Sequence, residues 1–102
     1  MLSSVVSTAS GYQPSSSMSE CQRQFEQAAS DVRRLKERPD NDTLLVLYAL
    51  YKQALEGDVH GCQPGFFDFI GTAKQEAWSR LKGMPQDEAM RQYVVLVRQL
   101  LD

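Results

Sequence analysis

The sequence lacks several features that define large classes of protein. None of its apolar runs approaches the roughly 20 residues that a membrane-spanning helix requires. Basic residues do not exceed acidic ones, and the net charge of −2 argues against a nucleic-acid binder, which usually presents a strongly basic surface. The composition, 42% hydrophobic and 24% charged in 102 residues, is that of a soluble globular protein with one modest core. An anionic ligand would have to be held by local cations.

Residues that commonly carry catalysis or bind metals are also scarce. The chain has one histidine, His60, and two cysteines, Cys21 and Cys62. Two cysteines are compatible with one bridge but do not make a disulfide framework, so we expect free thiols and a reducing, cytoplasmic location. We expect neither a zinc site nor any other metal. Because no Ser-His-Asp set or phosphate-binding loop is recognisable, the protein is not expected to be an enzyme.

The first nineteen residues differ from the rest of the chain. Residues 1–19 contain eight serines, no charge and no sustained periodicity, which predicts a disordered extension. A targeting peptide is the alternative, but the segment has no arginine or lysine and no true hydrophobic region. Met18 is another candidate start of translation. We expect the folded domain to span residues 20–102.

From residue 20 onward, apolar residues recur at helical spacing. The pattern predicts a first helical segment that Pro39 stops and a second for which Asp40, Asn41 and Asp42 all offer N-caps and which Gly57 ends. It also predicts a third from about Phe69 through Lys82 and a fourth with Pro85 in its first turn. Strand patterns are absent, so the prediction is an all-α, four-helix bundle. Residues 57–67 form a loop, and the unusually apolar Phe66, Phe67 and Phe69 predict that part of this region packs inward.

Two tyrosines and a lysine share one face of the second predicted helix. Tyr48, Tyr51 and Lys52 stand at positions i, i+3 and i+4, so their side chains lie on one side. Ordinary packing explains this if the rings are buried, their hydroxyls stay wet and the lysine extends along them. The same groups also suit a phosphorylated nucleotide, because a ring can stack on a base while hydroxyl and ammonium bind phosphate.

A longer pattern then resembles a known family. The residues that carry it are Pro39, Leu45, Tyr48, Tyr51-Lys52-Gln53-Ala54, Gly57-Asp58, Pro64-Gly65, Asp68-Phe69, Gly71, Ala73-Lys74 and Ala77-Trp78. From roughly Glu20 to Leu101 the chain strongly resembles the acyl-CoA-binding protein family, also called diazepam-binding inhibitor. The Tyr-Lys-Gln-Ala run, with a tyrosine three residues before it and Gly-Asp after it, is a specific match.

The resemblance implies a carrier and pool former that binds medium- to long-chain acyl-CoA thioesters, such as palmitoyl-CoA, for lipid metabolism. The residues that it implies at the CoA head group are Tyr48, Tyr51, Lys52, Lys74, Tyr93, Arg33 and Arg38. Those implied at the acyl chain are Ala28, Leu44, Leu45, Phe66 and Phe67. Acyl-CoA-using enzymes are expected partners of a monomer, whereas a cofactor, a nucleic acid and stable membrane insertion are not expected.

The chain also departs from the family pattern. Where the family usually carries two lysines and a tryptophan, this sequence has Ile70, Thr72 and Gln75. The lost cations motivate an alternative, namely a helical protein-interaction module of the same fold with weakened or lost ligand binding. A third reading, a domain of a larger protein such as an isomerase fusion, finds little support in the chain's length.

Overall fold

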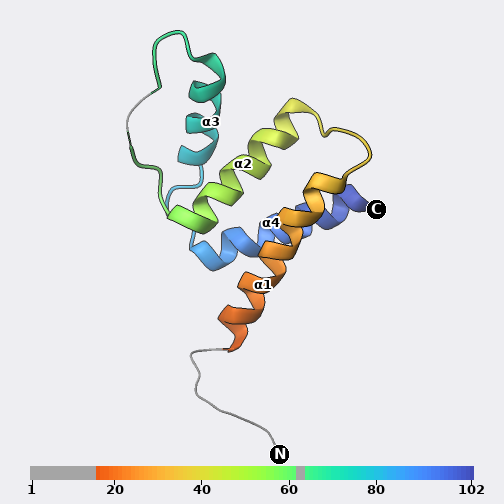
Figure 1. Cartoon of the computed structure of the whole chain (residues 1–102). Helices are drawn as coiled ribbons and strands as arrows, with labels where there is room; N and C mark the ends of the chain where they lie inside the picture. Colours follow the sequence, from red (N-terminus) through yellow and green to blue (C-terminus); the bar gives the residue numbers. More distant parts are fainter. Residues whose placement is uncertain (1–15, 62–63) are drawn as a thin grey trace, which may run out of the picture.

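The computed structural model describes residues 16–61 and 64–102, and over these ranges it contains four α-helices, one 3-10 helix and no strand. The elements are α1 (Ser16–Asp31), η1 (Val32–Arg34), α2 (Asn41–Glu56), α3 (Phe69–Ser79) and α4 (Gln86–Leu101), shown in Figure 1. The all-α prediction is confirmed. Helix α1 begins at Ser16, inside the predicted extension, while residues 1–15 and Cys62 lie outside the described residues.

The helix ends follow the sequence signals at some positions and not at others. The carboxylate of Asp40 accepts a hydrogen bond from the backbone N–H of Thr43 at 2.8 Å, and Gly57, with φ of 77°, ends α2 as predicted. The predicted end of the third helix at Lys82 is wrong. Helix α3 ends at Ser79, because the next residues form i to i+3 turns that lead to Gly83. Pro85 precedes α4 instead of lying in its first turn.

Helices α2 and α4 form the centre of the molecule. Helix α1 packs on α4, and α3 packs on α2, so that α1 and α3 lie on opposite sides of the central pair (Figure 1). The core cluster joins α1, α2 and α4 through Phe25, Ala28, Leu47, Leu50, Ala54, Ala89, Met90, Tyr93, Val94 and Val97. This arrangement leaves the surfaces of α1 and α3 that face each other across α2 available to line a groove.

A polar junction around the buried Gln53 ties the end of α2 to the start of α4. Gln53 is fully buried, and its amide nitrogen donates to the carboxylate of Asp58 at 3.0 Å and to the carbonyl of Met84 at 2.9 Å. The same Asp58 carboxylate accepts a hydrogen bond from the backbone N–H of Gly83 at 2.7 Å. Gln53 of the Tyr-Lys-Gln-Ala run and Asp58 of the Gly-Asp run therefore stabilise the fold.

The inward packing predicted for the aromatic loop is wrong. Phe66, Phe67 and Phe69 are all strongly exposed in the structure. Phe66 and Phe67 lie in a turn before α3 and touch each other, and Phe69 is the first residue of α3. Because α3 contacts the bundle mainly through α2, its first turn extends beyond the core and has no helix to cover it.

Candidate functional site

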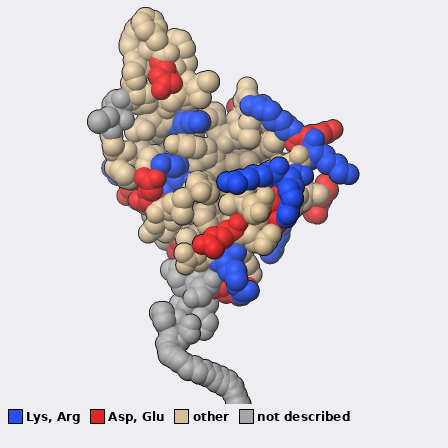
Figure 2. Space-filling model, in the orientation of Figure 1, with Lys and Arg blue, Asp and Glu red and all other residues tan. Residues whose placement is uncertain are grey.

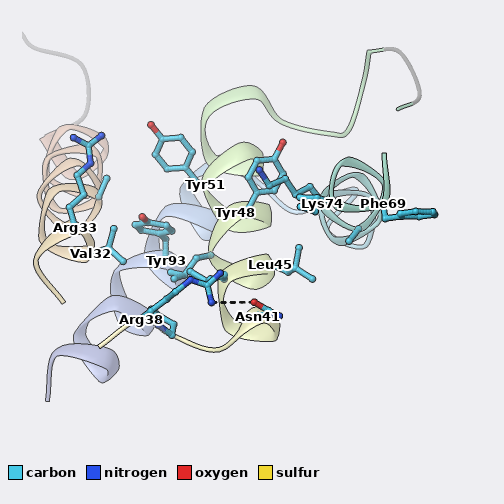
Figure 3. A pocket seen from close by; sticks show the side chains of 16 residues that line it. Val32, Arg33, Arg38, Asn41, Leu45, Tyr48, Tyr51, Phe69, Lys74 and Tyr93 are labelled. Atoms are coloured by element: carbon cyan, nitrogen blue, oxygen red, sulfur yellow. Dashed lines mark hydrogen bonds between the residues drawn. The ribbon is translucent and has the colours of Figure 1, made fainter. Parts of the chain in front are cut away.

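A groove of about 900 Å³ lies between α1 with η1 on one side and α2 with α3 on the other. This volume is at the upper end of the range of about 300–1,000 Å³ that is usual for small-molecule sites. Residues from all four helices line it, and Figure 3 shows lining side chains on α2, α3, α4 and η1. The groove combines three tyrosine rings, three cations and an apolar floor.

The tyrosines form one wall of the groove. Tyr48 and Tyr51 project from α2, and Tyr93 comes from α4 (Figure 3). The ring centroids of Tyr51 and Tyr93 are 6.0 Å apart, and Phe25 contacts both rings from the core side. Burial raises the pKa of the Tyr93 hydroxyl, and neighbouring Tyr51 adds to this effect while Arg33 opposes it. Tyr93 therefore stays neutral near physiological pH and can donate a hydrogen bond.

Three basic side chains line the same groove. Arg33 comes from η1, Arg38 from the segment before α2, and Lys74 from α3. The ammonium of Lys74 lies 5.1 Å from the ring centroid of Tyr48, within the range of a cation–π contact. A guanidinium nitrogen of Arg38 donates to the side-chain oxygen of Asn41 at 3.3 Å, as drawn in Figure 3. The groove thus holds cations at its edges and aromatic rings between them.

Lys52 does not line the groove. Its ammonium pairs with the carboxylate of Glu56 and lies 4.9 Å from the ring centroid of Trp78. The pair with Glu56 is the main reason that the pKa of Lys52 is raised, with burial acting in the opposite direction. His60 contacts the other oxygen of Glu56 at 3.0 Å. The sequence already contained this signal, because Lys52 and Glu56 stand at i and i+4.

The apolar part of the groove agrees only in part with the residues named from the sequence. Leu44 and Leu45 line it, whereas Ala28 is buried in the core and its neighbour Ala29 takes the lining position. Phe66 and Phe67 are not among the lining residues. The structure adds lining residues that the sequence analysis did not assign to the ligand site, namely Val32, Pro39, Asn41, Leu47, Phe69, Ile70 and Ala73.

Helical spacing could have identified several of these additional residues. Phe69, Ala73 and Lys74 stand at i, i+4 and i+5, which places them on neighbouring parts of one helix surface. A binding role for Lys74 therefore predicts that Phe69 and Ala73, on the same part of the helix surface, also lie at the site. Ile70 stands four residues before Lys74 and follows the same rule. Its contribution is apolar at a position where the family pattern suggested a cation.

The described residues contain no group of three or more histidine, cysteine, aspartate or glutamate side chains arranged to hold a metal ion. Within residues 16–61 and 64–102, no helix is both long and apolar enough to cross a bilayer. Cys21 is the one free cysteine of the described chain, and it packs beside the core away from the groove. The groove, with its tyrosine rings and cations, has side chains suited to binding a charged ligand that contains an aromatic ring.

The fold and groove define a small all-α protein that can hold an amphipathic, anionic ligand with an aromatic part. The chain belongs to the acyl-CoA-binding protein family, because the family model described as "Acyl CoA binding protein" matches residues 22–97. It is 48% identical over 77 residues to "Acyl-CoA-binding protein homolog 1" of Caenorhabditis elegans, a match that covers 76% of this chain and 90% of that protein.

Solved structures agree with this assignment. The crystal structure of acyl-CoA-binding protein 2 from Oryza sativa matches with a TM-score of 0.81 and 36% identity, over 85% of this chain and 95% of that one.

The chain is also 47% identical over 79 residues to rat enoyl-CoA delta isomerase 2. That match covers 78% of this chain but only 20% of the isomerase, so it concerns one part of a larger protein.

Proposed function

We propose that this protein binds medium- to long-chain acyl-CoA thioesters in the groove and acts as a carrier without catalysing a reaction. The observation that carries the proposal is the composition of the groove itself. Tyrosine rings and three cations lie beside a floor that includes Leu44, Leu45 and Val32. A CoA thioester has the matching parts, namely an adenine ring, several phosphate charges and an acyl chain.

The head group is assigned to the tyrosines and cations. Adenine would stack on the exposed face of Tyr51, since a base–aromatic stack stabilises binding by about 1–3 kcal/mol. Lys74 would meet a phosphate beside the Tyr48 hydroxyl, and Arg33 with Arg38 would meet phosphates from the opposite edge. Lys52 would have to leave Glu56 before it could join them, so we assign the leading role to Lys74.

The acyl chain is assigned to the apolar surface of α2 and α3. Leu44 and Leu45 would contact it from one side, and Ile70 with Ala73 from the other. Burial of a sixteen-carbon chain is worth on the order of 10 kcal/mol at roughly 0.8 kcal/mol per methylene, before the costs of ordering. Chain burial would thus supply affinity, while the rings and cations select the CoA head group.

The remaining parts of the proposal concern the cellular role. A carrier of this kind would act as a cytoplasmic monomer, hold a pool of acyl-CoA and exchange it with enzymes that use acyl-CoA. Membership of the acyl-CoA-binding protein family supports binding as the main role. The isomerase similarity does not argue for activity here, because it covers 20% of that enzyme.

Isothermal titration calorimetry tests this function. Palmitoyl-CoA should bind with one-to-one stoichiometry, and free CoA should bind far more weakly because it lacks the chain. Tyr51→Leu should lose affinity, whereas the matched Tyr51→Phe, which keeps a flat ring, should lose little. An absence of heat with palmitoyl-CoA, in a protein that melts cooperatively, would favour an interaction module that has lost its ligand.

A further inference from the structure

Four large apolar side chains gather at one end of α3. Phe66, Phe67, Phe69 and Ile70 are 87%, 78%, 74% and 72% exposed. The rings of Phe66 and Phe67 meet edge to face with centroids 4.8 Å apart, and Phe69 and Ile70 follow within four residues of Phe66, so four exposed apolar side chains stand close together in the chain. Scattered exposed apolar residues are ordinary, but a contiguous cluster marks an interaction surface. We call these four residues the aromatic tip.

The shape and charge of the aromatic tip indicate the kind of surface that it fits. It occupies a protruding end of the molecule, which Figure 2 shows as uncharged surface around a single acidic group. Asp68 is the one charged residue in the stretch 64–70, and its carboxylate caps α3 by accepting from the backbone N–H of Gly71 at 2.8 Å. A convex, apolar knob without a basic residue suits a soft, zwitterionic lipid surface better than an anionic one.

The aromatic tip is continuous with the groove. Phe69 and Ile70 line the groove, and the exposed Phe66 and Phe67 lie shortly before them in the chain, in the turn that leads into α3. The cations of the groove lie on other elements or farther along α3, so the tip provides an apolar edge. An acyl chain that entered or left past this edge would meet apolar side chains along its path.

We propose that the aromatic tip docks reversibly on a zwitterionic phospholipid bilayer, with Phe66 and Phe67 inserted at head-group depth and the groove mouth facing the membrane. The purpose of docking rests on the proposed function. A long-chain acyl-CoA is an amphiphile that partitions into bilayers, since each buried methylene favours the lipid phase. A docked groove would take up or release the chain with little exposure to water. Two rings provide transient attachment and not a permanent anchor.

Vesicle flotation of the ligand-free full chain tests this surface. With phosphatidylcholine vesicles, the wild type should float with the lipid, and Phe66→Ser combined with Phe67→Ser should reduce the bound fraction about tenfold or more. The matched control is Val46→Ser combined with Val95→Ser, which removes two exposed apolar side chains from the other face of α2 and α4 and should float like wild type. High salt should leave binding unchanged, because the contact is apolar.

A lipid-free titration with palmitoyl-CoA separates this proposal from the function on which it rests. The double phenylalanine variant should keep wild-type affinity there, since Phe66 and Phe67 lie outside the groove lining. A loss of that affinity would instead place the pair in the ligand site. Wild-type protein that stays in the buffer, or a dimer that the same variant dissociates, would also overturn membrane docking. A chain that floats but binds no palmitoyl-CoA would contradict only the proposed function.

Discussion

Lys52 and Lys74 occupy different surroundings, although the family resemblance placed both at one phosphate. Lys74 lies in the groove against the ring of Tyr48, whereas Lys52 is paired with Glu56 over the ring of Trp78. A lysine that already has a carboxylate partner must give up that pair to bind a ligand. Lys74 should therefore contribute more binding free energy to a phosphate than Lys52 does.

Lys74→Ala should weaken palmitoyl-CoA binding more than Lys52→Ala does. A charge-assisted hydrogen bond contributes about 1.5–3 kcal/mol, which corresponds to roughly ten- to hundred-fold in affinity. Calorimetry on both variants measures the difference, and Arg98→Ala, an exposed cation outside the groove, is the control for net charge. If Lys52→Ala produced the larger loss, Lys52 would turn from Glu56 to the ligand, and our ranking of the two lysines would be reversed.

Ile70→Lys should strengthen binding by a few-fold, most clearly at low ionic strength. Ile70 lines the groove at an exposed position, and a cation beside a partly exposed phosphate is worth about 0.2–1 kcal/mol. Thr72→Lys is the matched control, because it adds the same charge at an exposed residue outside the groove lining. Equal gains from both substitutions would mean that general charge, and not this position, attracts the ligand.

Asp58 links the elements at the end of α2 and the start of α4. The backbone N–H of Gly83 and the amide of Gln53 hold the pKa of the Asp58 carboxyl below its usual value. A lowered folded-state pKa stabilises the fold above the unfolded value of about 4, and this stability is lost as the pH falls through the folded pKa. Asp58→Asn should therefore lower the melting temperature at neutral pH.

The same variant should approach wild-type stability in acid. Below about pH 4 the carboxyl is protonated in the unfolded state, and once the pH also falls below the lowered pKa of the folded state it is protonated in both states, so the advantage of the charge disappears. Thermal unfolding followed by circular dichroism across this range measures the convergence. A gap in melting temperature that stays constant with pH would show that the carboxylate charge makes no contribution at this junction.

Removal of residues 1–15 should leave the bundle and its binding intact. The segment has no charge and many serines, and such a composition cannot bury enough apolar area to offset chain entropy. A chain that begins at Ser16, the first residue of α1, should match the full chain in melting temperature and in palmitoyl-CoA affinity. A fall of several degrees would indicate that this segment packs on the domain.

For the individual helices, local sequence signals predicted where a helix begins and ends better than they predicted which of its side chains are buried. The candidates Asp40, Asn41 and Asp42 marked the start of α2, which Asp40 caps, and Gly57 marked its end, because capping depends on residues close in sequence. The exposure of Phe66 and Phe67 could not be read in this way, since it depends on which helix lies beside α3. Likewise, the helical face of Tyr48 and Lys52 was evident, but the competing pair with Glu56 decided where the lysine points.

For the whole molecule, the arrangement of helices explains where a ligand can bind. The central pair α2 and α4 carries the core, and the flanking helices α1 and α3 enclose the groove between them. A second, smaller hollow on the other face, lined by Val46, Leu50 and Val95 among others, lacks aromatic rings. The second hollow can therefore serve as a control surface when ligand binding to the groove is measured.

The most direct test is nuclear magnetic resonance of the backbone amides during titration with palmitoyl-CoA. We predict that the largest shift changes cluster at Tyr48, Tyr51, Ala73 and Lys74 around the groove, with small changes at Val46 and Val95 in the second hollow. Free CoA should perturb the tyrosine and cation positions but leave Leu44 and Leu45 nearly unchanged. Changes concentrated in the second hollow, or no saturable changes at all, would contradict an acyl-CoA site in this groove.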